Sequence, residues 1–246
     1  MRGLFSGNVW LGNAKLPHPQ IMEGVLKIIE NAIREAWSRV IKNIDVNSMK
    51  AKDAYEDQLT EALWKYLEEI RLQSLSGFCP DQFESVQRES NWRDVPNSSI
   101  DKQPDLVFKF SGKPRFGVDL DSAVYDGLFV ECKPIDSKHS IQGHYLNKGL
   151  SRFVDGTYAW AMQDAMMLGY TNDCFNLNRK LIPALSKLSV QQALKMSALP
   201  LPCEGDTVIS DRCKTLHIRE WPYQHNREKS GPIRIKHLWL GYESLP

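Results

Sequence analysis

Hydrophobic residues recur with helical spacing in two segments near the start of the chain. In residues 20–43, apolar side chains return every three or four positions, so they would share one face of a helix. Pro17 and Pro19 precede this segment, where proline is favoured before a helix. Residues 52–72 show the same spacing. The pattern therefore predicts two amphipathic helices, each packed through one apolar face.

The pattern changes to strands in the middle of the chain. Residues 73–103 are polar and punctuated by glycine and proline, and we expect a loop there with at most one short strand. Alternating residues then predict a meander of three strands, at 105–110, 116–121 and 128–133. Pro134 is expected to end the third strand because proline cannot donate a backbone hydrogen bond.

The second half of the chain mixes helices and strands. We expect a helix within residues 140–153, a compact helix at 157–170, and a helix in two pieces over 180–196, broken near Ser189. Alternation near the end of the chain predicts a long hairpin, with strands at 215–219 and 233–240.

These elements suggest an N-terminal addition and one main domain. Residues 1–50 would form an irregular arm and a packing helix, and residues 51–246 a domain extended by the C-terminal strands. We expect the two parts to form one globular unit of the α/β class.

Composition narrows the class of protein without naming an activity. Hydrophobic residues make up 42% of the 246 positions, enough for a substantial core. The formal net charge of +1 gives no overall field that would indicate nucleic acid or a membrane as partner. No apolar run approaches the roughly 20 residues of a membrane span. The five cysteines are scattered without a C-x-x-C pair, which suits a reducing compartment, and we expect a cytoplasmic protein.

One short strand carries the most informative chemistry. In Asp126–Lys133, side chains alternate between two faces, so Glu131 and Lys133 would emerge side by side. Asp105 opens an earlier strand of the same meander. Converging carboxylates suit Mg²⁺ or Mn²⁺, which prefer oxygen ligands, and the carbonyl of Cys132 could add a neutral oxygen.

Two further residues could complete such a site. Glu56 lies at the edge of the buried face of the second helix, where an acid is costly unless it is paired or bound to metal. An exposed acid in the first turn of a helix is the alternative reading. Lys133 could hold an attacking water or stabilise the charge on a phosphate, or, if desolvated, titrate low enough to accept a proton.

Together these residues resemble the signature of the PD-(D/E)xK nuclease superfamily. Glu56-x-x-Leu-Thr, Pro104-Asp105 before an apolar strand, and Glu131-Cys132-Lys133 carry the resemblance, which covers roughly residues 52–170. It implies a restriction-endonuclease-like αβββαβ core with a mixed central sheet, here with an N-terminal helical addition and a C-terminal β-hairpin.

The resemblance also implies roles for the individual residues. Asp105 and Glu131 would be metal ligands, Lys133 the catalytic lysine and Glu56 an auxiliary acid, in Mg²⁺-dependent hydrolysis of phosphodiester bonds. DNA is the commonest substrate of the superfamily, and RNA is the alternative. If the strand at 116–121 carries the acid instead, Asp121 replaces Asp105.

Basic residues outside this motif are candidate contacts to substrate phosphates. His144 and Arg152 follow the Glu-x-Lys strand, and His217 and Arg219 lie in a C-terminal segment with more Lys and Arg than Asp and Glu. Polar residues on a solvated surface are the alternative reading for all four.

The sequence thus predicts a metal-dependent endonuclease that cuts DNA. A role as effector of a phage-defence or restriction system fits by analogy of fold. Near-neutral charge suggests that a partner protein or a second copy supplies binding or control. The alternative is a catalytically silent nuclease-like scaffold that binds nucleic acid or a partner protein.

Overall fold

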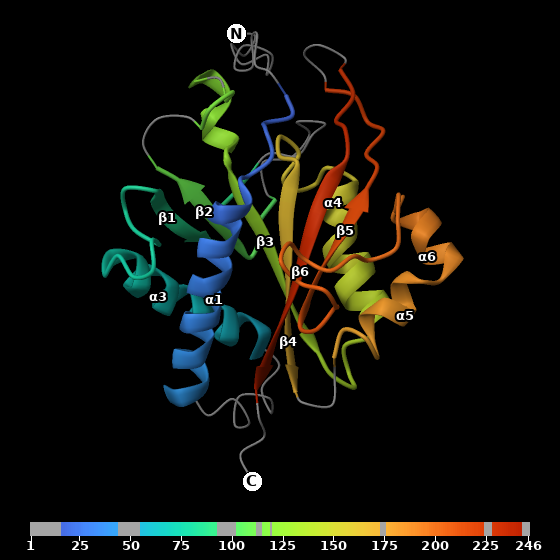
Figure 1. Cartoon of the computed structure of the whole chain (residues 1–246), viewed down its shortest axis with the longest axis horizontal. Coiled ribbons are helices and arrows are strands. Elements are labelled where there is room, and N and C mark those ends of the chain that lie inside the picture. Colours follow the sequence, from blue (N-terminus) through green and yellow to red (C-terminus); the bar gives the residue numbers. More distant parts are fainter. Residues whose placement is uncertain are drawn as a thin grey trace, which may run out of the picture.

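A six-stranded mixed sheet forms the centre of the molecule, with helices against both of its faces (Figure 1). The computed structural model describes residues 16–43, 55–92, 102–111, 115–118, 120–172, 176–223 and 228–242. The strands are β1 (Phe83–Arg88), β2 (Leu106–Phe110), β3 (Gly127–Ile135), β4 (Asp164–Asn172), β5 (Arg212–His217) and β6 (Ile233–Tyr242). Their order is β1-β2-β3-β4-β6-β5.

The sheet combines antiparallel and parallel pairs. β1, β2 and β3 form an antiparallel meander, and β4 runs parallel to β3. β6 runs parallel to β4, and β5 closes the far edge as the antiparallel partner of β6. The C-terminal hairpin predicted from alternation is therefore confirmed.

The helices lie in two groups. α1 (Glu23–Asn43) and α3 (Tyr55–Leu72) pack together over one face of the sheet (Figure 1). The π-helix η2 (Ile141–Leu150) continues into α4 (Ser151–Val154), and η2 packs on the other face against β3 and β4. Two short helices, α5 (Leu181–Leu185) and α6 (Leu188–Ala193), follow. These helices confirm the segments predicted at 20–43, 52–72 and 140–153, and the split helix over 180–196, although its break falls at residues 186–187 rather than near Ser189.

The strand predicted at 116–121 is wrong. Residues 116–117 form a turn, and a 3₁₀-helix (Leu120–Tyr125) follows. Gly117 has a φ of 85°, which lies outside the range of an extended strand. Phe116 is fully exposed, so its side chain does not anchor the segment to the core as a strand. The meander still has three strands, because β1 pairs with β2. β1 is the short strand allowed within residues 73–103.

The compact helix predicted at 157–170 is also wrong, because its second half is β4. This strand lies between β3 and β6 and is buried on both faces. A strand covered on both faces reads as a continuous apolar run, and such a run does not distinguish a buried strand from a buried helix.

Pro134 does not end β3, which continues to Ile135. The N–H of Cys132 points away from β4, toward a side chain on the β2 side. Backbone groups two residues apart in a strand point the same way, so the nitrogen of Pro134 faces that side as well. β2 pairs with β3 only as far as Val130, and the missing N–H of Pro134 therefore breaks no strand hydrogen bond.

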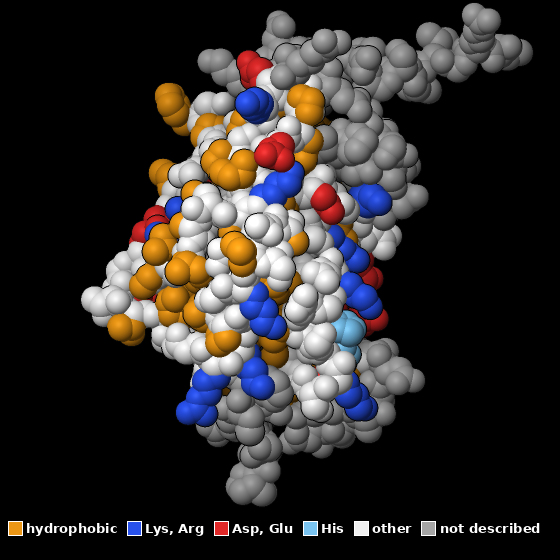
Figure 2. Space-filling view, turned by 90° about the vertical axis from the view of Figure 1, so that its right-hand side faces the viewer, with side chains coloured by type: hydrophobic (Ala, Val, Ile, Leu, Met, Phe, Trp, Pro, Cys, Tyr) orange, Lys and Arg blue, Asp and Glu red, His pale blue; other side chains and the backbone are white. Residues whose placement is uncertain are grey.

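One hydrophobic core includes side chains from α1 through β6. On the side that carries α5 and α6, hydrophobic side chains also spread over the surface (Figure 2). Leu188, Leu199 and Val208 are each more than half exposed. No helix in the described part of the chain combines the length and the apolar character that a membrane crossing requires.

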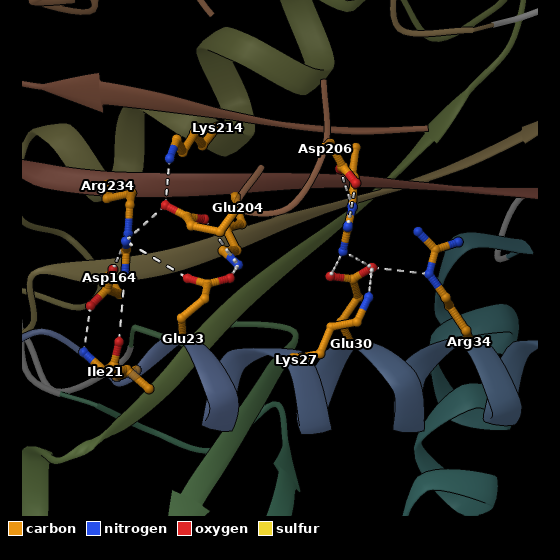
Figure 3. Close-up of polar contacts among 12 residues, drawn as sticks. Ile21, Glu23, Lys27, Glu30, Arg34, Asp164, Glu204, Asp206, Lys214 and Arg234 are labelled. Carbon is orange, nitrogen blue, oxygen red and sulfur yellow. Dashed lines mark hydrogen bonds and ion pairs between the residues drawn. The ribbon is translucent and has the colours of Figure 1, made fainter. Parts of the chain in front are cut away.

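Buried ion pairs fasten α1 to the strands β5 and β6 (Figure 3). The Glu30 side chain, almost fully buried, accepts hydrogen bonds from Arg212 at 2.6 and 2.8 Å and from Arg34 at 3.1 Å. Nearby, Asp164 of β4 accepts from Arg234 and from the backbone of Ile21, each at 2.7 Å. Buried charges are tolerated only when paired, so this network fixes where α1 sits on the sheet.

We predict that Glu30→Ala lowers the free energy of unfolding by about 2 kcal/mol, because Arg212 keeps its contact with Asp206 but loses its buried carboxylate partner. Glu35→Ala is the matched control: Glu35 lies on the same helix, its side chain is 53% exposed, and it pairs with Arg39 one turn away. The control should cost less than about 0.5 kcal/mol. Urea unfolding monitored by circular dichroism measures both, and equal losses would contradict a docking role for Glu30.

Candidate active site

The structure brings together the four residues of the predicted motif. Glu131 and Lys133 lie on β3, Asp105 immediately precedes β2, and Glu56 is in the first turn of α3. The Nζ of Lys133 lies 2.8 Å from Glu56 Oε1, 2.9 Å from Glu131 Oε1 and 3.5 Å from Asp105 Oδ2. One ammonium group therefore contacts three carboxylates from three different elements.

The short length of β2 creates the space for this cluster. Strand pairing between β2 and β3 ends at Leu106 and Val130, so the second half of β3 has a free edge. Asp105 occupies that edge, where its Oδ2 accepts the backbone N–H of Cys132 at 2.6 Å. The carboxylate of Asp105 is thus held against β3 by the backbone itself.

Glu131 lies at the bottom of the site. Its side chain is fully buried, and Oε1 also accepts a hydrogen bond from Arg152 Nη1 at 2.8 Å. Within the described residues, its Oε2 has no hydrogen-bond partner. Arg152 also donates to Tyr158 Oη at 2.9 Å, and Tyr158 donates to the carbonyl of Gln103 at 2.8 Å.

Tyr158 is a site residue that sequence reasoning missed. It was assigned to the start of an expected helix, whereas it lies in the turn before β4 and reaches Arg152 from there. No local signal would have found it, because its contact depends on how the chain turns after α4.

Electrostatics make the cluster short of positive charge. Glu56, Asp105 and Glu131 can carry three negative charges, against the two positive charges of Lys133 and Arg152, the cations that contact these carboxylates in the described residues. Burial raises the pKa of Glu131 to about 8, and Asp105 adds to the effect while Lys133 and Arg152 oppose it. Burial likewise raises the pKa of Glu56, against the opposing effect of Lys133.

Lys133 behaves in the opposite way to an isolated buried lysine. Burial alone would lower its pKa, but the charges of Asp105, Glu131 and Glu56 outweigh that effect and raise the pKa above its ordinary value. Of the two roles left open by the sequence, the structure therefore favours a permanently charged ammonium over a lysine that accepts a proton.

The donor atoms fit a hard divalent metal ion, although no three His, Cys, Asp or Glu side chains of the described residues are already arranged around a metal position. Lys133 draws the three carboxylates toward its ammonium group instead. Asp105, Glu131 and the carbonyl of Cys132 supply only oxygen, the ligand that Mg²⁺ and Mn²⁺ prefer. The unpartnered Glu131 Oε2 is a buried acceptor that lacks a donor or a cation.

Asp105 lies in the cluster, whereas Asp121, the alternative acid, does not lie on a strand. The segment expected to present it as a strand is the 3₁₀-helix Leu120–Tyr125, and its side chain lies outside the described part of the structure. Asp119, the other acid in that segment, falls among the residues that the structure does not describe.

The four basic residues predicted to contact substrate divide into two pairs. Arg152 joins the site, and His144 lies nearby on η2 with its ring 5.0 Å from that of His139. His217 and Arg219 are buried in the hairpin region. His217 Nδ1 lies 2.8 Å from the carbonyl of Leu194, and Arg219 donates to backbone carbonyls that include Met162 at 2.7 Å.

The interpretation of His217 and Arg219 as substrate contacts is therefore corrected. Alternation predicts a strand in this segment but not which of its faces meets solvent. Their face lies inward, and both side chains brace the backbone rather than meeting a ligand.

We predict that the metal-free protein loses stability as pH rises from about 4.5 to 8. The folded state keeps a proton on Glu131 over this window while the unfolded state releases it, with a slope of up to about 1.4 kcal/mol per pH unit. Glu131→Gln should remove most of this slope, and Glu84→Gln, an exposed acid on β1, should leave it unchanged.

Urea unfolding in EDTA at pH 5.5, 6.5 and 7.5 measures the slope. Added Mg²⁺ should stabilise the wild type more at pH 7.5 than at pH 5.5, because the ion competes with the proton for the carboxylate. A Mg²⁺ effect that persists in Glu131→Gln would place metal binding elsewhere.

Comparisons with known proteins return no relative of this chain. No family model matches it, and neither the curated proteins nor the solved structures contain a match. Its function is therefore inferred from its own side chains and their geometry.

Proposed function

We propose that this protein is a metal-dependent nuclease of the PD-(D/E)xK type that hydrolyses phosphodiester bonds in DNA. The observation that carries the proposal is the contact of one ammonium group, Lys133 Nζ, with carboxylates from α3, the start of β2 and β3. The cluster has more negative than positive charge, so a bound cation would complete it.

The order of elements supports this assignment. α3, β1, β2, β3, the η2–α4 helix and β4 follow one another as αβββαβ, with an antiparallel meander and a fourth strand parallel to the third. The acids and the lysine stand at the beginning of β2 and in the second half of β3. In this assignment α1 and the β5–β6 hairpin are additions to the core.

The residues divide the work of hydrolysis among them. Asp105, Glu131 and the Cys132 carbonyl would hold Mg²⁺ or Mn²⁺, which when bound lowers the pKa of a water molecule and neutralises charge on the phosphate. The Lys133 ammonium orients the attacking water or stabilises the extra negative charge that develops on the phosphoryl group. Glu56 holds Lys133 in place, and Arg152, whose side chain is half-buried, can reach a phosphate oxygen.

The same contacts also define the second candidate, a catalytically silent scaffold that binds nucleic acid or a partner protein. Lys133 already pairs with all three carboxylates without any metal, as it would in a purely structural cluster. A role in phage defence or restriction, and control by a partner protein or second copy, belong to the first proposal.

We predict that the wild type cleaves DNA with Mg²⁺ or Mn²⁺ and that EDTA abolishes the reaction. Lys133→Ala should lower the rate at least 100-fold because it removes a charge that acts on the transition state. Lys65→Ala is the matched control, since Lys65 is an exposed lysine on α3 that pairs with Glu61. Supercoiled plasmid, linear duplex and single-stranded RNA, each resolved on gels, identify the substrate.

Three outcomes separate the hypotheses. Metal-dependent cutting lost in Lys133→Ala supports the nuclease. Absence of cutting on every substrate with either metal favours the silent scaffold. Cutting that survives Lys133→Ala would mean that this cluster is not the active site.

A further inference from the structure

An Asp–His pair stands just beyond the end of β3. Asp136 Oδ1 accepts the backbone N–H groups of Lys138 and His139 at 2.8 and 2.9 Å, and His139 Nδ1 lies 2.9 Å from the same oxygen. Because a carboxylate accepts, Nδ1 carries the proton of this contact, and Nε2 is the nitrogen left on the outer side of the ring. The His139 side chain is 28% exposed, so a ligand can reach it.

Two rings link this pair to the proposed active site. On one side His144 of η2 meets His139 edge to face, and on the other the ring of Tyr55, the residue before Glu56, lies 6.4 Å away. Partial burial lowers the pKa of His144, and the charges of Lys148, His139 and Lys133 add to the effect. A lowered pKa leaves His144 neutral near pH 7. His139 differs from it in having a carboxylate, Asp136, as its hydrogen-bond partner.

The pair lies beyond the end of β3, away from the contact of Arg152 with Glu131 along the chain. Arg152 and Tyr158 lie against Glu131, whereas Asp136 and His139 follow β3 beyond Lys133. Displacement at phosphorus places the attacking and leaving oxygens on opposite sides of the phosphorus atom. A site for this reaction therefore needs one group for the attacking water and another for the leaving oxygen. In the proposed function Lys133 can serve the attacking water, and the leaving oxygen still lacks a proton donor.

We propose that His139, oriented by Asp136, is a further catalytic residue that protonates the leaving oxygen of the cleaved strand; this inference rests on the proposed nuclease function. The water oxygen forms a bond to phosphorus as the bond from phosphorus to the leaving oxygen breaks. The electron pair of that bond stays on the leaving oxygen, which takes the proton from His139 Nε2. The proton lost by the attacking water passes to solvent, and His139 regains one from solvent.

This role makes the rate depend on pH in a definite direction. A general acid must carry its proton to act, so cleavage that depends on one should slow at high pH. Among the described residues, three groups face the His139 ring: Asp136 in its own loop, Tyr55 of α3 and His144 of η2. Lys148 and Lys133 act indirectly, because their charges lower the pKa of His144. Of the three groups that face the ring, Asp136 is the one in hydrogen-bond contact.

Substrates with a sulfur atom in place of the leaving oxygen test the proposal. A thiolate leaves without a proton, so the sulfur substrate removes the need for a general acid. Single-turnover cleavage with Mn²⁺ is compared for the wild type, His139→Gln, His144→Gln and Lys133→Ala on oligonucleotides with oxygen or bridging sulfur. The bridging position, 3′ or 5′, is the one that the wild-type products show to be broken.

We expect His139→Gln to lose about 100-fold on the oxygen substrate and little on the sulfur substrate. Any loss in His144→Gln or Lys133→Ala should be the same on both. The wild type provides a second readout that needs no variant: its decline at high pH should disappear with the sulfur substrate. Thermal unfolding checks that each variant is folded.

Equal losses of His139→Gln on the two substrates, or no loss on either, would overturn the role of His139 while leaving the nuclease proposal intact. A high-pH decline that is the same for oxygen and sulfur would do so as well. If the wild type cuts neither substrate with any metal, the nuclease proposal itself fails and this inference falls with it.

Discussion

The shared ammonium group of Lys133 is the interaction on which the candidate site depends. It holds together carboxylates from α3, the segment before β2, and β3, which would otherwise repel one another at close range. It is also insufficient, because even with Arg152 the cluster keeps an excess of negative charge. Burial first, and then the charge of Asp105, raise the pKa values of Glu56 and Glu131, so these carboxyls favour a proton. A divalent cation would neutralise the carboxylates in another way.

Among the described residues, the charge cluster on β3 and the charge network beneath α1 are both buried, but they differ in how fully their carboxylates are paired. The network beneath α1 pairs Glu30 with Arg34 and Arg212 and leaves neither of its carboxylate oxygens without a donor (Figure 3). Such a cluster orients elements and needs no ligand. The β3 cluster instead leaves Glu131 Oε2 without a partner among the described residues. Burial of charge alone therefore does not indicate a site; incomplete compensation of charge does.

Sheet geometry explains why the site lies where it does. β2 is shorter than β3, so the second half of β3 presents free backbone and side chains toward α3 and η2. Asp105 uses that free edge, and Pro134 is tolerated there for the same reason. The helix after β3 then covers the strand and carries Arg152 to Glu131.

The sequence by itself determined the amphipathic helices and the strands β2 and β3, because periodicity is a local property. The resemblance of its short motifs to the PD-(D/E)xK signature predicted the grouping of Glu56, Asp105, Glu131 and Lys133. Only the tertiary structure decided that residues 164–172 form a central strand, that His217 and Arg219 face inward, and that Tyr158 and the Asp136–His139 pair lie beside the site. Each of these depends on which segment covers a given face, and that is set by contacts between residues far apart in the chain.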